Sequence, residues 1–188
     1  MKYGDEYRVI QLAPAAMNIV RSAISKSDLE MKEAGTNNNP ESTARSSQIA
    51  WLYDNDLAQM LFDVAKQINQ LSGWNLSIKG LEPVQFGIYP EGGHYGWHVD
   101  QHKRPDPKMN GMVRKISCTV FLNDPSEYEG GEFDIEIYKP EAEPRYSTIK
   151  ESKGSAVFFQ GDQWHRVRPV TSGLRKSLVA WFYGPPYI

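Results

Sequence analysis

The sequence has few cysteines and no long apolar run. Cys118 is the only cysteine among 188 residues, so the chain forms no internal disulfide and no cysteine-rich zinc site. No stretch reaches the roughly 18 to 20 apolar residues that a membrane helix needs. The best early run, 9–20, contains polar residues and a proline, and it follows acidic residues rather than the basic region of a secretory signal. We therefore expect a soluble, cytoplasmic protein with no membrane partner.

An excess of either charge is also missing. The chain has 21 Lys and Arg against 23 Asp and Glu, for a net charge of -2. Non-specific binding to phosphate backbones depends on a strong basic excess, so nucleic acid is not an expected partner. Hydrophobic residues make up 40% and charged residues 23% of the chain, which is typical of a globular domain and excludes a disordered chain or a coiled coil.

The first part of the chain predicts helices. A short helix is expected over 15–25, after Pro14, and a longer one over 56–71, where apolar residues recur every three or four positions. Asn55 or Asp54 can cap the longer helix, and Gly73 can end it. The polar stretch 32–47 is a predicted loop. Because the helix stripe needs a sheet or a second helix to cover it, we expect it to pack onto the rest of the chain.

From Leu81 onward, short runs of Val, Ile, Phe and Tyr alternate with turn residues, which is typical of a many-stranded sandwich or barrel. We predict strands at 83–89, 97–100, 114–122, 132–138, 155–159, 164–167 and 174–183, with a turn at 169–173. The expected fold is mainly β (α+β), a sandwich or jelly roll backed by N-terminal helices. Because the helices need the sheet, we predict one domain over 1–188, with helical support in about 1–75 and the jelly-roll core in about 81–185.

The strongest functional signal is the pair His98 and Asp100. Residues two apart on a strand point to one face, so an imidazole and a carboxylate project together. His165, 65 residues after Asp100, can complete a set of two histidines and one carboxylate, although His102 continues the same alternation and is an alternative. Such a set leaves about three positions of an octahedral metal open, which favours non-haem Fe(II) oxygen chemistry over closed tetrahedral zinc. A single strand histidine is more often structural, and His94 is expected in a turn.

Arg175 and Ser177 fall on one face of the predicted strand 174–183. Val179 and Trp181 share that face, which indicates that it points inward. A guanidinium beside a hydroxyl is a fitting receptor for a carboxylate, because charge-assisted hydrogen bonds are strong. The alternative is a surface arginine, but a buried guanidinium without an anionic partner is unfavourable. The pattern therefore predicts an anion receptor.

Several motifs occur in one order along residues 81–183. They are Tyr89 through His98-Val99-Asp100, then Asn123-Asp124-Pro125, Tyr128-Glu129-Gly130-Gly131-Glu132-Phe133, and His165 through Ser177 with an arginine ten positions after His165. In the residues and the order of these motifs, the chain resembles the Fe(II)- and 2-oxoglutarate-dependent dioxygenases, and within them the prolyl 4-hydroxylase-like, PKHD-type branch. The resemblance implies a double-stranded β-helix, the cupin-like form of the jelly roll.

The resemblance also implies a ligand set. His98, Asp100 and His165 are implied to hold Fe(II), with O2 as the other substrate and ascorbate as a reductant. Arg175 is implied to bind the distal carboxylate of the cosubstrate 2-oxoglutarate, with Ser177 as a second donor.

Two aromatic positions bear on the same cosubstrate. Tyr89 matches a tyrosine that lies against the cosubstrate near the metal in relatives. Where some animal relatives have another tyrosine, this sequence has Phe121, so the resemblance implies the loss of one hydrogen bond to the cosubstrate. Ser177 or Thr119 is expected to replace it.

The implied activity is hydroxylation of a substrate carbon, with release of succinate and carbon dioxide. A prolyl residue in a peptide or protein is the expected substrate, and the loops 32–47 and 101–113 are expected to contact it. One alternative is an oxygenase acting on a nucleobase or a free small molecule; the acidic balance disfavours the nucleobase. The other is a non-catalytic cupin-like module that holds metal or sugar, which has no need of Arg175. The sequence does not indicate the oligomeric state.

Overall fold

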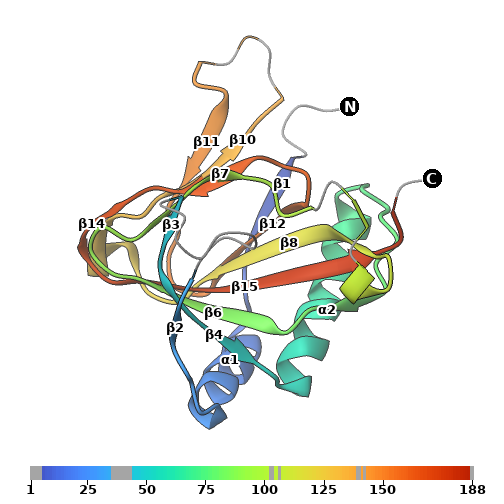
Figure 1. Cartoon of the computed structure of the whole chain (residues 1–188), viewed down its shortest axis with the longest axis horizontal. Coiled ribbons are helices and arrows are strands. Elements are labelled where there is room, and N and C mark those ends of the chain that lie inside the picture. Colours follow the sequence, from blue (N-terminus) through green and yellow to red (C-terminus); the bar gives the residue numbers. More distant parts are fainter. Residues whose placement is uncertain are drawn as a thin grey trace.

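The computed structural model describes residues 6–34, 44–101, 104–105, 107–138, 141 and 143–186. They form two antiparallel sheets and two helices (Figure 1), so the predicted mainly β fold with N-terminal helices is confirmed. The larger sheet contains, in order across it, β1 (Tyr7–Gln11), β12 (Ser155–Gln160), β8 (Val113–Phe121), β15 (Arg175–Gly184), β6 (Val84–Tyr89), β4 (Gln48–Leu52) and β2 (Lys32–Glu33), and β5 (Gly80–Leu81) pairs with β15.

The smaller sheet lies opposite the larger one. It contains, in order, β11 (Tyr146–Ile149), β10 (Phe133–Glu136), β13 (His165–Val167), β7 (His94–His98) and β3 (Arg45–Ser46). A separate ladder joins β9 (Tyr128–Gly130) to β14 (Val170–Gly173), and short 3-10 turns cover Pro107–Met109 and Pro125–Glu127. The β10–β11 hairpin projects from the body of the molecule at the top of Figure 1.

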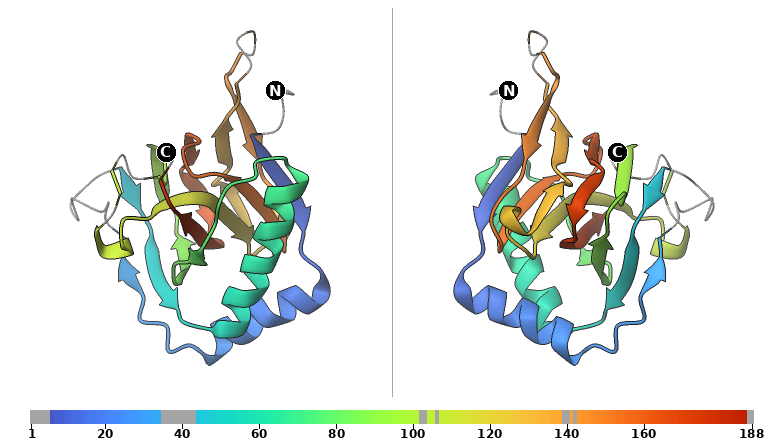
Figure 2. Two further views of the ribbon diagram at one scale, coloured as in Figure 1. Left: turned by 90° about the vertical axis from the view of Figure 1, so that its right-hand side faces the viewer. Right: turned by 90° about the vertical axis from the view of Figure 1, so that its left-hand side faces the viewer.

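The two helices, α1 (Pro14–Lys26) and α2 (Asn55–Leu71), lie on one face of the larger sheet (Figure 2). Asp54 caps the N-terminus of α2, because its carboxylate accepts a hydrogen bond from the Leu57 N–H at 2.8 Å. After Leu71, Gly73 adopts a positive φ of 69°, which lets the chain turn away. Both helices therefore lie close to the predicted positions.

Alternation along the central strands separates two cores. On β8, Ile116, Cys118 and Val120 face the helices, while the residues between them face the smaller sheet. On β15, Leu178, Ala180 and Phe182 belong to the helix-side core. Because side chains on a strand alternate between faces, the remaining positions of both strands line the space between the sheets, where the candidate site lies.

Three local predictions were wrong. The N-terminal support is not only helical, because β1 to β4 also come from this part and extend the sheets. His94 begins β7 rather than lying in a turn, since it pairs with Ser46 of β3. The expected turn at 169–173 contains β14, which pairs with β9. Each of these strands depends on a partner far away in the sequence.

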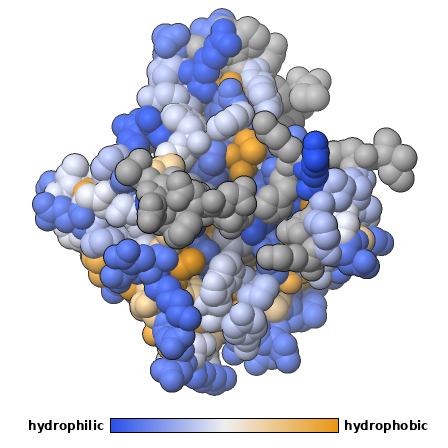
Figure 3. Space-filling view, in the orientation of Figure 1, coloured by the Kyte–Doolittle hydropathy of each residue, from blue (hydrophilic) through white to orange (hydrophobic). Residues whose placement is uncertain are grey.

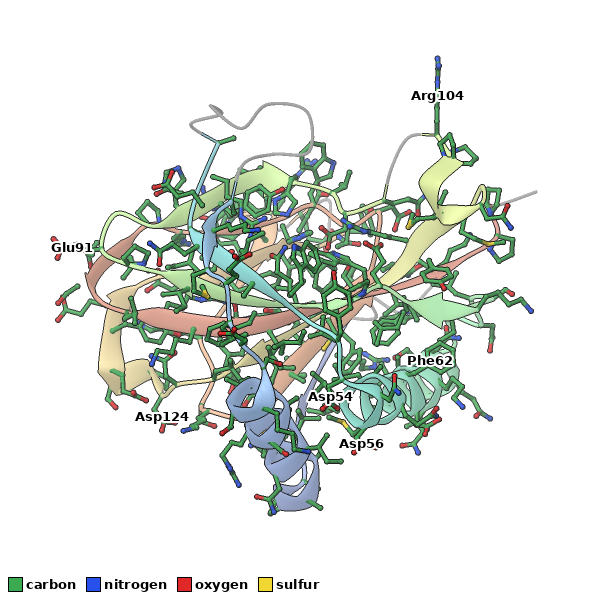
Figure 4. The ribbon with its side chains drawn as sticks, turned by 60° about the horizontal axis from the view of Figure 1, so that its bottom comes forward. Asp54, Asp56, Phe62, Glu91, Arg104 and Asp124 are labelled. Atoms are coloured by element: carbon green, nitrogen blue, oxygen red, sulfur yellow. The ribbon has the colours of Figure 1, made fainter. Side chains whose placement is uncertain are left out.

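Parts of the two predicted substrate loops, 35–43, 102–103 and 106, lie outside the described residues, and so does the alternative ligand His102. Arg104 points away from the sheets (Figure 4). In the described part of the chain, no helix combines the length and apolar character needed to cross a membrane. On the face seen in Figure 3, hydrophobic residues form small separate patches among polar ones.

Candidate functional site

His98, Asp100 and His165 come together in the space between the sheets. Their candidate ligand atoms all lie within 4.8 Å of one another. Asp100 Oδ1 is 3.7 Å from His98 Nε2, and Asp100 Oδ2 is 3.5 Å from His165 Nε2. The structure therefore brings together the three residues that the sequence predicts as one metal-binding set.

Two neighbouring strands and a tight turn position these residues. His98 ends β7 and His165 begins β13, and the two are paired across the strands. Asp100 follows β7 instead of lying in it, and its backbone N–H donates to the Gly161 carbonyl at 3.0 Å. A Cβ on Gly161 would lie 2.6 Å from the Arg114 carbonyl oxygen, so only glycine allows this close approach.

Both histidines present the same nitrogen to the centre of the set. His98 Nδ1 donates to the Gly96 carbonyl at 2.8 Å, and His165 Nδ1 donates to the Gln163 carbonyl at 2.9 Å. Because Nδ1 carries the proton in each ring, Nε2 keeps its lone pair for a metal. The burial of His98 and the neighbouring His165 lower the pKa of His98, so it is neutral at neutral pH.

Asp100 is buried and held in the ionised form. Its Oδ2 accepts a hydrogen bond from Ser117 Oγ at 2.7 Å. Burial disfavours the charged carboxylate, but the neighbouring imidazoles, Arg114 and Ser117 outweigh it and lower the pKa of Asp100. A neutral imidazole at His98 beside an ionised Asp100 matches the protonation states that metal binding requires.

Tyr95 packs directly on one of the candidate ligands. The rings of Tyr95 and His98 are stacked, with centroids 3.6 Å apart and an interplanar angle of 16°. The Arg45 guanidinium lies 4.6 Å from the Tyr95 ring centroid, and it also donates to Gln85 Oε1 at 2.8 Å. These contacts fix the ring plane of His98.

Arg175 lies in the same pocket and is 1% exposed. Its Nη1 donates to Ser177 Oγ at 3.1 Å, which confirms that the two residues share a face. Within the described residues, its Nε and Nη2 atoms are buried without a hydrogen-bond partner. A buried guanidinium in this state is unfavourable unless an anion completes its hydrogen bonds. Tyr89 lies beside it, with the ring centroid 5.1 Å from Arg175 Cζ.

The candidate metal ligands and Arg175 line one continuous pocket. Its wall is formed mainly by inward-facing residues of both sheets, namely Arg45, Gln85, Tyr89, Tyr95, His98, Asp100, Thr119, Phe133, Phe159, His165, Val167, Arg175, Ser177, Val179 and Trp181. All six predicted site residues are among them. A small dianionic molecule that chelates a metal at one end and meets a guanidinium at the other fits the charges of this pocket.

Sequence reasoning did not assign roles to Ser117, Tyr95 or Tyr128. Ser117 is a polar residue in a hydrophobic strand, and its alternation with Thr119 and Phe121 places it on the inward face. The sequence pattern therefore could have identified Ser117 as a candidate site residue. Tyr95 lies three residues before His98 on β7, where regular alternation would place the two side chains on opposite faces, so the pattern did not predict their stacking. Tyr128 carried no local signal, because it comes close to Arg175 only through the pairing of β9 with β14.

The sequence of the chain is similar to those of known proteins. The sequence model of the 2OG-Fe(II) oxygenase superfamily matches residues 84–183. A PKHD-type hydroxylase of Pseudoalteromonas atlantica is 37% identical over 100 residues, which cover 53% of this chain and 42% of that protein. One of Hyphomonas neptunium is 40% identical over 98 residues, covering 52% and 41%. The matches therefore span well under half the length of these relatives.

Solved structures share the fold. A Pseudomonas putida prolyl-4-hydroxylase superposes with a TM-score of 0.69 at 22% identity, covering 95% of this chain and 93% of that one. A viral collagen prolyl hydroxylase of Paramecium bursaria Chlorella virus-1 gives 0.67 at 21% identity, covering 96% and 97%. At these identities the likeness concerns the fold, and it confirms the predicted jelly roll.

Proposed function

The chain belongs to the 2OG-Fe(II) oxygenase superfamily, and from this we propose that it is an Fe(II)- and 2-oxoglutarate-dependent dioxygenase that hydroxylates a prolyl residue of a peptide or protein. Succinate and carbon dioxide are the other products. The observation that carries the proposal is one pocket that holds both the His98, Asp100 and His165 cluster and the buried, incompletely bonded Arg175.

His98, Asp100 and His165 would hold Fe(II) from one side. When bound, Fe(II) and 2-oxoglutarate supply the chemistry that activates O2 and transfers one oxygen atom to a substrate C–H bond. The protein keeps the two Nε2 lone pairs directed at the metal position through the backbone hydrogen bonds of both Nδ1 atoms. Ser117 holds the Asp100 carboxylate in place. These fixed ligands reduce the reorganisation that metal binding requires.

Arg175 would bind the distal carboxylate of 2-oxoglutarate, with Ser177 bonded to its Nη1 and Tyr89 beside its guanidinium. A guanidinium fixed at one end of the pocket gives the cosubstrate one orientation, because its other end must then meet the metal. Burial of Arg175 in an apolar wall strengthens the interaction, since little water competes for the carboxylate. Ascorbate would serve as an external reductant.

Two tryptophans at the pocket favour a substrate with an apolar ring. Trp181 lines the pocket, and Trp51, which is 41% exposed, lies against it with ring centroids 6.1 Å apart. The Arg114 guanidinium stacks 4.0 Å from the Trp181 ring centroid and is fixed by Glu82 at 2.6 and 2.7 Å. The aliphatic face of a prolyl ring packs well on such aromatic surfaces.

The test is a turnover assay with Fe(II), 2-oxoglutarate, ascorbate and proline-containing peptides. We expect succinate to form, and the peptide to gain about 16 Da on proline, the mass of one oxygen atom. His98→Ala and Asp100→Ala should abolish Fe(II) binding and turnover. His94→Ala is the matched control, because His94 lies outside the cluster and should retain both.

Two outcomes contradict different parts of the proposal. Succinate formation with oxidation of a nucleobase or a small molecule, but of no peptide, would overturn the prolyl substrate and leave the dioxygenase chemistry in place. Metal binding without any succinate, under conditions where Arg175→Gln has no effect on 2-oxoglutarate binding, would identify a non-catalytic cupin-like module instead.

A further inference from the structure

Three buried polar atoms without a partner lie in one region beside the pocket. They are the Tyr128 hydroxyl and the Nε and Nη2 atoms of Arg175. Tyr128 is 3% exposed and Arg175 is 1% exposed, so water does not satisfy these groups from outside. Because an unmade hydrogen bond of a buried group is costly, this grouping indicates that a ligand completes it.

Strand pairing explains why Tyr128 lies beside Arg175. Tyr128 begins β9 and pairs with Gly173 of β14, two residues before Arg175. Gly131 is the common point of contact, since a Cβ there would lie 3.0 Å from Arg175 Cδ and 3.1 Å from Tyr128 Cε2. The two side chains therefore converge over a residue that leaves them room.

Two cations, Lys150 and Arg175, flank the Tyr128 ring. Lys150 Nζ lies 4.5 Å from the ring centroid and donates to the Tyr128 carbonyl at 3.1 Å, and Lys150 in turn lies 3.9 Å from Glu132. Burial raises the pKa of Tyr128, and the charge of Arg175 and the approach of its guanidinium to the hydroxyl only partly offset this. The phenol therefore keeps its proton at neutral pH, and neither flanking cation can accept it.

Two other residues beside the guanidinium, Ser177 and Phe121, leave no unpartnered hydroxyl there. Ser177 Oγ already accepts a hydrogen bond from Arg175 Nη1. Phe121 presents only its ring, whose centroid is 5.4 Å from Arg175 Cζ. Among the described hydroxyl groups beside the guanidinium, that of Tyr128 is buried and has no partner.

We propose that Tyr128 donates a hydrogen bond to the distal carboxylate of 2-oxoglutarate, together with Arg175, and so replaces the hydroxyl that Phe121 lacks. The proposal rests on the proposed function, because it concerns the cosubstrate of that same pocket. It assigns the Tyr128-Glu129-Gly130-Gly131 motif a direct role, in which the tyrosine binds the ligand and Gly131 leaves space for Arg175.

The experiment compares two ligands that differ only at the distal end. Isothermal titration calorimetry without O2 measures binding of 2-oxoglutarate and of 2-oxopentanoate, which lacks the distal carboxylate, to the Fe(II)-loaded protein. Tyr128→Phe should weaken 2-oxoglutarate binding by about tenfold to a hundredfold, as expected for a hydrogen bond to a charged group. Binding of 2-oxopentanoate should stay within about twofold.

Tyr146→Phe is the matched control, since Tyr146 contacts Trp97, Arg166 and Arg168 rather than Arg175. It should leave both affinities unchanged. The inference is wrong if Tyr128→Phe keeps the wild-type ratio of the two affinities, whether both stay the same or both fall together. If the wild-type protein itself does not prefer 2-oxoglutarate to 2-oxopentanoate, the proposed function fails instead.

Discussion

Asn123 fixes the main chain on both sides of Arg175. Its Nδ2 donates to the Leu174 carbonyl at 2.7 Å, and its Oδ1 accepts from the Lys176 N–H at 2.9 Å. The next residue, Asp124 (labelled in Figure 4), accepts a hydrogen bond from the Lys153 N–H at 2.9 Å. This bond holds the segment that contains Asn123 against the segment before β12. The direction of the Arg175 guanidinium therefore depends on a side chain more than fifty residues earlier.

We predict that Asn123→Ala weakens 2-oxoglutarate binding about tenfold while leaving Fe(II) affinity unchanged. Loss of two buried hydrogen bonds should also lower the free energy of unfolding by about 1 to 3 kcal/mol. Asn69→Ala is a close control, because Asn69 makes the same two kinds of hydrogen bond away from the pocket. Its Nδ2 donates to the Leu76 carbonyl at 2.8 Å, and its Oδ1 accepts from the Leu76 N–H at 2.9 Å. Equal loss of 2-oxoglutarate affinity in both variants would show that Asn123 acts only through global stability.

A second prediction concerns Gly131, which has a positive φ of 63°. Gly131→Ala adds backbone strain of about 1 to 3 kcal/mol and places a Cβ against Arg175 Cδ and Tyr128 Cε2. Gly73→Ala adds similar strain at a φ of 69°, but with no atom within 4 Å of the new Cβ. Calorimetry should therefore show weaker 2-oxoglutarate binding only in Gly131→Ala. Comparable 2-oxoglutarate binding in both variants would mean that Arg175 moves away from the added Cβ without losing affinity for the cosubstrate.

Local patterns predicted what depends on a single strand or helix. The alternation of β15 placed Arg175 and Ser177 on one face, and the three- and four-residue spacing located α2, because these periods follow from backbone geometry alone. The association of His98 with Asp100 was also predicted, although the turn bonded to Gly161, rather than strand alternation, brings it about.

The rest depends on pairing between distant segments. Tyr128 reaches Arg175 because β9 pairs with β14, and β1 forms because it pairs with β12. The register between distant strands is set by the packing of the whole sheet. A short stretch of neighbouring residues therefore does not predict which strands pair. The family resemblance supplied the expected role of Arg175, but it did not supply the contact between Tyr128 and Arg175.

A third prediction concerns the support of Asp100. Ser117→Ala removes the hydrogen bond to Asp100 Oδ2 and should weaken Fe(II) binding about tenfold to a hundredfold, as found for residues that orient metal ligands. Ser155→Ala is the control, because Ser155 is also buried on the same sheet but donates to Gln11 Oε1. A metal titration that gives the same Fe(II) affinity for both variants would contradict a positioning role for Ser117.

The last prediction uses the pH dependence of stability. Asp134 is fully buried and accepts bonds from Arg166 Nε at 2.7 Å, Arg168 Nε at 2.8 Å and Thr148 Oγ1 at 2.7 Å. Burial alone would raise the pKa of Asp134, but these bonds lower it below 3.8. The stabilisation by ionised Asp134 is therefore complete above pH 3.8 and is lost as the pH falls through the lower pKa of the folded state.

Asp134→Asn should lower the free energy of unfolding by about 1 to 3 kcal/mol at pH 7, and urea unfolding should show this difference shrinking below about pH 4. Asp63→Asn, on the exposed face of α2, should change little at either pH. A difference for Asp134→Asn that stays constant down to about pH 2 would mean that the packing of Asp134, and not its charge, stabilises the β10–β11 hairpin.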